Sequence, residues 1–137
     1  MFWLQPLFLI VFAAIVVFCL AQSLADRNRI QRNLELRQVE SLCSFVRGFN
    51  YRTIDTWILR AAYEQVQPLV GFPIRKTDNL RQDLKLDAED IDDIGEEIAQ
   101  RTSRQLTDTE MNPYFDRVNT VEDLVLFFSH QPRKDVA

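Results

Sequence analysis

The first 25 residues carry no charged side chain, and this segment constrains the fold more than any other feature of the sequence. Its central run, residues 7–20, is apolar without interruption. The whole segment is long enough to cross a hydrocarbon core of about 30 Å at about 1.5 Å per helical residue. Only a helix satisfies its own backbone hydrogen bonds there. Residues 1–25 therefore predict a transmembrane helix, with Trp3 as an interfacial anchor.

A cleavable signal peptide is the alternative interpretation of the same segment. Ser23 and Ala25 are small residues at the two positions that a signal peptidase reads, directly before Asp26. Against this alternative, no positive charge precedes the apolar run, and the run is longer than the usual core of a signal peptide. N-terminal sequencing of the mature protein distinguishes the two, because cleavage would leave Asp26 as the first residue.

The positive charges that flank the apolar segment predict its orientation. None precedes it, whereas four arginines follow it: Arg27, Arg29, Arg32 and Arg37. Positive flanks favour the cytoplasmic side, so we expect a single pass through the inner (cytoplasmic) membrane, with the N-terminus outside and the rest of the chain in the cytoplasm. Cys43 then lies in a reducing compartment, where we expect no disulfide and a small, buried side chain.

Charge divides the rest of the chain into a basic part and an acidic part. The net charge of -4 combines +4 over residues 26–76 with -8 over residues 77–137. Apolar side chains recur at steps of three and four over residues 26–50, which predicts a basic amphipathic connecting helix that ends near Gly48. Its apolar stripe packs on the domain that follows, docks on another membrane protein or pairs with itself.

The next predicted helix covers residues 53–70, where apolar side chains again recur at helical spacing. Asn50 or Thr53 is its expected N-cap, and Gly71 lies at its C-terminal end. Trp57 falls on the apolar spacing, so we expect it in the core or at the rim of the core.

An acidic helix is predicted after a polar loop. Ile91, Ile94 and Ile98 form its one inward stripe, and Asp87 is suited to cap it. So much like charge on one short helix is self-repulsive. It forms either a solvated face or a recognition surface for a protein partner with a basic surface. The carboxylates concerned are Glu89, Asp90, Asp92, Asp93, Glu96 and Glu97.

Two motifs flank this acidic helix. Residues 79–87 read Asn-Leu-Arg-Gln-Asp-Leu-Lys-Leu-Asp, and residues 119–124 read Asn-Thr-Val-Glu-Asp-Leu, with Thr120 placed to cap a last helix. Their order resembles the acyl carrier protein family, whose long first helix, acidic second helix and short third helix are similar to residues 53–68, 89–101 and 114–118. The resemblance implies an all-α fold: a four-helix acyl-carrier-like bundle over residues 51–131, with a tail at 132–137.

The sequence departs from that family at the residue that bears the prosthetic group. In carrier proteins a serine in an Asp-Ser-Leu triplet at the start of the second helix carries phosphopantetheine. The corresponding triplet here is Asp87-Ala88-Glu89. Ala88 has no hydroxyl to form the phosphodiester, and Glu89 replaces the apolar third residue. The resemblance therefore implies the carrier fold and its acidic recognition helix, with no covalent cofactor.

Other chemistries have little support in these residues. An EF-hand loop that started at Asp90 would place Ile94 at position five and Arg101 at position twelve, so no metal site is expected. Neither the single histidine, His130, nor an exposed acidic helix supplies a nucleophile–base pair, so no enzymatic activity is expected. The acidic C-terminal part argues against nucleic acid as a partner.

Together these patterns predict a non-enzymatic, membrane-anchored interaction or assembly module, a small subunit of a membrane protein complex. Its acidic helix would present carboxylates to a basic protein surface, which steers association and gives specificity. The alternative is a membrane-tethered carrier that binds acyl chains or lipids non-covalently between its helices. The membrane bilayer is a partner in both hypotheses.

Overall fold

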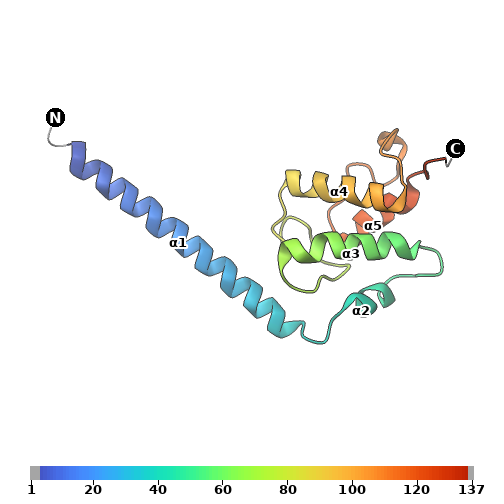
Figure 1. Cartoon of the computed structure of the whole chain (residues 1–137), viewed down its shortest axis with the longest axis horizontal. Helices are drawn as coiled ribbons and strands as arrows, with labels where there is room; N and C mark the ends of the chain where they lie inside the picture. Colours follow the sequence, from blue (N-terminus) through green and yellow to red (C-terminus); the bar gives the residue numbers. More distant parts are fainter. Residues whose placement is uncertain (1–3, 136–137) are drawn as a thin grey trace. The chain divides into compact units, whose positions relative to one another are not determined.

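The computed structural model describes residues 4–135. These residues form five α-helices and one 3-10 helix, with no β-strand among them, so the predicted all-helical class is confirmed (Figure 1). The chain divides into two compact units, Met1–Leu36 and Arg37–Ala137. Within the described residues, the first unit is a single helix, and the C-terminal unit contains all the others.

Helix α1, Leu4–Leu36, is the long apolar helix predicted at the N-terminus. In the described part of the chain, it alone is long and apolar enough to cross a membrane. None of its residues is buried, and successive positions such as Phe8, Ile10 and Phe12 expose large apolar side chains. A helix that is apolar on all sides matches a lipid environment better than the surface of a domain in water. Trp3, the predicted anchor, lies outside the described residues.

The polar segment after the apolar run does not form the single connecting helix predicted over residues 26–50. That prediction is wrong, because α1 continues to Leu36 and a separate helix, α2, spans Leu42–Arg47. Ser41 accounts for the new start. Its hydroxyl accepts a hydrogen bond from the Ser44 backbone N–H at 3.5 Å, and the Ser44 hydroxyl accepts one from the Ser41 N–H at 2.8 Å. This reciprocal capping box begins α2 after a turn.

The C-terminal unit is arranged around α3, Thr56–Val70, which packs against α2, α4 and α5 (Figure 1). Helix α4 spans Ala88–Thr102 and α5 spans Val121–His130, with the 3-10 helix η1, Thr109–Met111, between them in the chain. Residues 114–116, in the predicted third helix, form a turn. The core combines buried side chains of the helices and of the long loop after α3: Ile58, Leu59, Val66, Phe72, Leu80, Ile98, Val121 and Phe128.

Two of the predicted helix caps are confirmed. Asp87 caps α4 in a reciprocal box with Asp90, and Thr120 caps α5 in a reciprocal box with Asp123. Each box satisfies backbone N–H groups that the first turn of a helix leaves without an intrahelical partner. The sequence therefore determined where both helices begin.

The ends of α3 are set by an aspartate and a glycine. Asp55 is the N-cap, and its carboxylate accepts a hydrogen bond from the Trp57 backbone N–H at 2.9 Å. The predicted caps, Asn50 and Thr53, are wrong, because the chain makes turns there before the helix begins. At the other end Gly71 has a φ of 80°, a left-handed conformation that favours glycine and ends the helix.

Arg37, predicted as part of the membrane flank, is a buried residue of the C-terminal unit. Its guanidinium donates to the Asp78 carboxylate at 2.6 Å and 2.9 Å, and to the Pro73 carbonyl oxygen at 2.9 Å. The Arg75 backbone N–H donates to the same carboxylate at 2.8 Å. A bidentate pair between an arginine and a carboxylate is stronger than a single neutral hydrogen bond and fixes the relative orientation of the two side chains. It fixes the first residue of the unit to the loop that follows α3.

Candidate functional site: the face of α4 and the groove beside it

Helix α4 has one buried face and one acidic face. Ile94, Ile98 and Ala99 are buried, whereas Ile91, predicted on the same stripe, is only half-buried. The apolar spacing thus fixes which side of the helix packs on the rest of the unit. The carboxylate side chains between these positions therefore point towards solvent.

The six predicted acidic residues divide into two groups. Asp90 is half-buried, and its carboxylate accepts a hydrogen bond from the Asp87 backbone N–H at 3.1 Å to complete the capping box. The other five are exposed, and none of them has an ion pair within residues 4–135. We call these five residues the acidic face of α4: Glu89, Asp92, Asp93, Glu96 and Glu97.

At the C-terminal end of α4, in contrast to the acidic face, the charged side chain forms an ion pair with another helix. Arg101 donates a hydrogen bond to Glu64 of α3, and Arg60 donates to the same carboxylate at 2.7 Å. The bond from Arg101 and then that from Arg60 lower the pKa of Glu64. Charge therefore connects α4 to α3 at its last turn, and the acidic face on the preceding turns keeps its charge available.

Ala88 is the first residue of α4, and its side chain is exposed. The resemblance to carrier proteins predicts that their serine corresponds to this position. The methyl group of Ala88 provides no oxygen for a phosphodiester. The helix start is therefore capped and accessible, but it has no group for covalent attachment.

A groove of about 340 Å³ lies between α4 and α5. Ile91 and Gly95 line it from α4 and Phe127 from α5, and the segment between the two helices closes it with Leu106 and Val118. Most of the lining is apolar, and Asp92 and Glu96 of the acidic face border it, so the groove suits a ligand with a hydrocarbon body better than a fully polar one.

Gly95 keeps this groove open. A Cβ placed on Gly95 would lie 3.8 Å from Phe128 Cζ, so a methyl group fits, and a longer side chain would occupy the groove. Phe128 is buried and Phe127 is half-buried, because adjacent side chains on a helix point about 100° apart. A glycine inside an otherwise regular helix was the one sequence signal for this groove.

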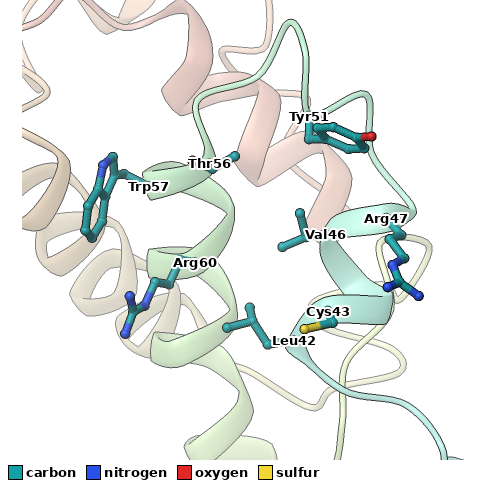
Figure 2. Close-up of a pocket in the computed structure, with 8 residues that line it drawn as sticks. All are labelled: Leu42, Cys43, Val46, Arg47, Tyr51, Thr56, Trp57 and Arg60. Carbon is teal, nitrogen blue, oxygen red and sulfur yellow. The ribbon is translucent and has the colours of Figure 1, made fainter.

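A second groove, of about 480 Å³, lies between α2 and the first turns of α3 (Figure 2). Leu42 and Val46 of α2 lie between the two helices, and Trp57 and Arg60 come from α3. Sequence reasoning missed this groove because it expected one continuous helix through α2. We call it the α2–α3 groove; its lining residues are Leu42, Cys43, Val46, Arg47, Tyr51, Thr56, Trp57 and Arg60.

The predictions for Cys43 and Trp57, two residues of this groove, have different outcomes: the one for Cys43 is wrong, and the one for Trp57 holds only for the rim of the core. Cys43 is exposed rather than buried, because Phe45 and Phe49 supply the buried side chains at α2. Trp57, expected in the core or at its rim, is 64% exposed, which excludes the core. It lies at the edge of the buried stripe of α3, beside Arg60, whose guanidinium carbon is 5.8 Å from the indole ring.

Three of the remaining predicted residues are arginines on α1, and the fourth, His130, has its ring Nδ1 2.8 Å from the Leu126 carbonyl oxygen. Arg27 and Arg32 are exposed, and Arg29 Nε lies 3.9 Å from an Asp26 carboxylate oxygen. Within residues 4–135, no group of three or more His, Cys, Asp or Glu residues is placed to hold a metal ion. The exposed ring of His130 is 5.2 Å from that of Tyr114.

No family model, no curated protein and no solved structure matches this chain. Its function therefore has to be argued from its own residues and their geometry.

Proposed function

We propose that this chain is a non-enzymatic, single-pass membrane protein whose C-terminal unit is an interaction module, a small subunit of a membrane protein complex. The acidic face of α4 is the observation that carries the proposal. Its five carboxylates are exposed and have no ion pair among the described residues. They repel one another on a helix that the core holds in place, and a basic protein surface relieves that repulsion.

The proposed anchor is α1. Its length and its apolar first half support a span, and the arginines that follow support an N-terminus outside and a cytoplasmic C-terminal unit at the inner membrane. A retained anchor keeps residues 4–25 on the mature protein. Release at Asp26 would instead place the C-terminal unit in a secreted or periplasmic compartment, and N-terminal sequencing separates the two results.

The C-terminal unit is proposed to be a degenerate acyl-carrier-like domain. The order of its elements supports this proposal: α3, a long loop, a capped acidic helix, a short 3-10 helix and a threonine-capped last helix. Because Ala88 replaces the serine, we expect an intact mass equal to that of the polypeptide. A mass increase equal to a phosphopantetheine arm would overturn the degenerate assignment.

The recruitment mechanism is tested by reversing the acidic face. We expect the triple variant Asp93→Lys, Glu96→Lys, Glu97→Lys, purified from membranes in mild detergent, to lose co-purifying proteins that the wild-type chain retains. The substitutions spare Asp90, whose carboxylate caps the helix. Identification of the lost proteins by mass spectrometry then names the partner.

A matched control carries the same change of charge elsewhere. Glu35, Glu110 and Asp135 are exposed and have no ion pair within residues 4–135, so lysine at all three positions leaves the acidic face intact. We expect this control to retain the partner and to show the salt sensitivity of the wild-type complex. Equal retention by both triple variants would refute the mechanism.

A second candidate function is non-covalent binding of an acyl chain or lipid. The apolar groove between α4 and α5 favours it. We expect native mass spectrometry to detect retained lipid in the wild-type chain and less of it in Gly95→Leu, because leucine fills the groove. Gln100→Leu, at an exposed position of the same helix, is the control and should retain lipid.

A further inference from the structure

The α2–α3 groove exposes aromatic side chains to a degree that a small domain rarely maintains in water. Trp57 is 64% exposed and Tyr51 is 54% exposed, and both line the groove (Figure 2). The half-buried Leu42 and Val46 complete an apolar lining. Contiguous exposed apolar surface with a polar edge marks a contact site for a protein or a membrane. Indole and phenol rings in particular prefer the level of lipid headgroups.

The edge of this groove is positively charged. Arg47 lines it, and Arg52 follows Tyr51 in the adjoining turn; neither has an ion pair in the described part of the chain. The neighbouring carboxylates are already paired: Glu40 with Arg75, Asp55 with Arg104 and Arg133, and Glu64 with Arg60 and Arg101. The groove therefore offers uncompensated guanidinium groups beside apolar side chains.

Chain connectivity keeps this groove within reach of a bilayer. Leu42, the first residue of α2, follows the last residue of α1 by six positions. Six residues span at most roughly 20 Å, and the polar end of α1, residues 26–36, adds about 16 Å of helix. If α1 spans a membrane, the groove is thus tethered within roughly 36 Å of that membrane's surface.

We propose that the α2–α3 groove docks on the anionic lipid surface of the membrane that holds α1. The proposal rests on the proposed anchor and adds an orientation for the C-terminal unit. Trp57 and Tyr51 enter the headgroup region, and Arg47 and Arg52 contact lipid phosphates. Helix α4 packs on α3, on the side opposite to α2 (Figure 1). Docking therefore turns the acidic face away from a negatively charged bilayer and towards a protein partner.

The test uses the full chain in lipid nanodiscs. The sequence has two tryptophans, so Trp3→Phe leaves Trp57 as the only indole. We expect brominated lipids to quench Trp57 fluorescence in nanodiscs that contain phosphatidylglycerol. Quenching should fall when phosphatidylcholine replaces the anionic lipid and when salt is raised, because each arginine near the surface changes the docking equilibrium by roughly fivefold.

A pair of charge variants identifies the surface that docks. Arg47→Glu with Arg52→Glu should abolish the quenching, and Arg81→Glu with Arg117→Glu, two exposed arginines outside the groove, should preserve it. A second readout uses Cys43 in a Cys19→Ser background. Anionic lipid should slow its alkylation by a membrane-impermeant maleimide, because Cys43 lines the groove.

The outcomes separate the docking proposal from the anchor. A chain that does not co-elute with nanodiscs refutes both. A chain that co-elutes and whose Trp57 is not quenched in anionic lipid refutes docking alone, and would assign the groove to an acidic protein segment. Equal quenching in neutral and anionic lipid would also overturn the proposal, because it removes the role of the arginines.

Discussion

The two sides of α3 carry opposite chemistry. On the side of α2, Arg47 and Arg52 lie in or next to the α2–α3 groove and have no ion pair within residues 4–135, and the nearby carboxylates are paired. On the side of α4, five exposed carboxylates have no ion pair among the described residues. The same central helix thus separates a basic, aromatic-lined groove from an acidic helix face.

This difference does not follow directly from the charge division in the sequence. The basic and acidic parts meet at residues 76 and 77, yet Arg101 and Arg133 of the acidic part pair with Glu64 and Asp55 of the basic part. Folding pairs charges from both parts. Among the described residues it leaves Arg47 and Arg52 beside the α2–α3 groove and the acidic face of α4 without ion pairs, together with other exposed charges. The predictions below test which contacts hold each side of α3, from the largest expected effect to the smallest.

On the side of α2, the largest expected loss of stability comes from substitution of Arg37. We expect Arg37→Ala to lower the free energy of unfolding by about 3–5 kcal/mol, because the buried Asp78 carboxylate loses its charged partner. Urea unfolding in mild detergent, followed by circular dichroism, measures the loss. Arg32→Ala, at an exposed position of α1, should change it by less than about 0.5 kcal/mol. Comparable values for the two variants would mean that Arg37 is only a flanking charge.

On the side of α4, stability depends on the buried apolar side chains of that helix. Ile98 is fully buried, so we expect Ile98→Ala to cost about 2–5 kcal/mol through lost apolar burial and the cavity that remains. Trp57→Ala removes a larger side chain and should cost less, because most of the indole is already in contact with water. The same unfolding measurement compares the two. A larger cost for Trp57→Ala would show that the groove is closed in the free protein.

The start of α4 gives a third, smaller effect. We expect Asp87→Ala to cost about 1 kcal/mol, since it removes the side-chain acceptor for the Asp90 backbone N–H and a carboxylate at the positive end of the helix dipole. Ala88→Ser at the neighbouring exposed position should be close to neutral. Helix-resolved hydrogen exchange should show fraying in the first turn of α4 only in Asp87→Ala.

The contact between α3 and α4 gives the smallest effect, and it depends on pH. The pKa of Glu64 is lowered in the folded protein, so its ionised form contributes stability above the pKa of the unfolded chain. That contribution is lost as the pH falls through the folded pKa. Because Glu64 is one-third exposed, we expect only about 0.3 kcal/mol. In Glu64→Gln this part of the loss of stability at low pH should disappear. If the stability of the variant falls with pH as steeply as that of the wild-type protein, the loss comes from other carboxylates.

Local sequence signals predicted several elements well. The apolar run predicted α1, and the caps Asp87 and Thr120 predicted the first residues of α4 and α5. Such signals succeed because they depend on neighbours within one helical turn. The wrong predictions concern side chains whose burial depends on residues far away in the sequence. Arg37 is buried in a pair with Asp78, 41 residues along the chain, and Cys43 is exposed because Phe45 and Phe49 supply the buried side chains at α2.

The sequence by itself determined the helical class, the apolar N-terminal helix and the acidic composition of α4, because each depends on residue type and short-range periodicity. The tertiary structure decided which charges remain unpaired and where the grooves lie. Those outcomes depend on pairs such as Arg101 with Glu64 and on the packing of α2 and α4 against α3. Long-range pairing cannot be derived from periodicity, and it distinguishes the basic groove side of this unit from its acidic side.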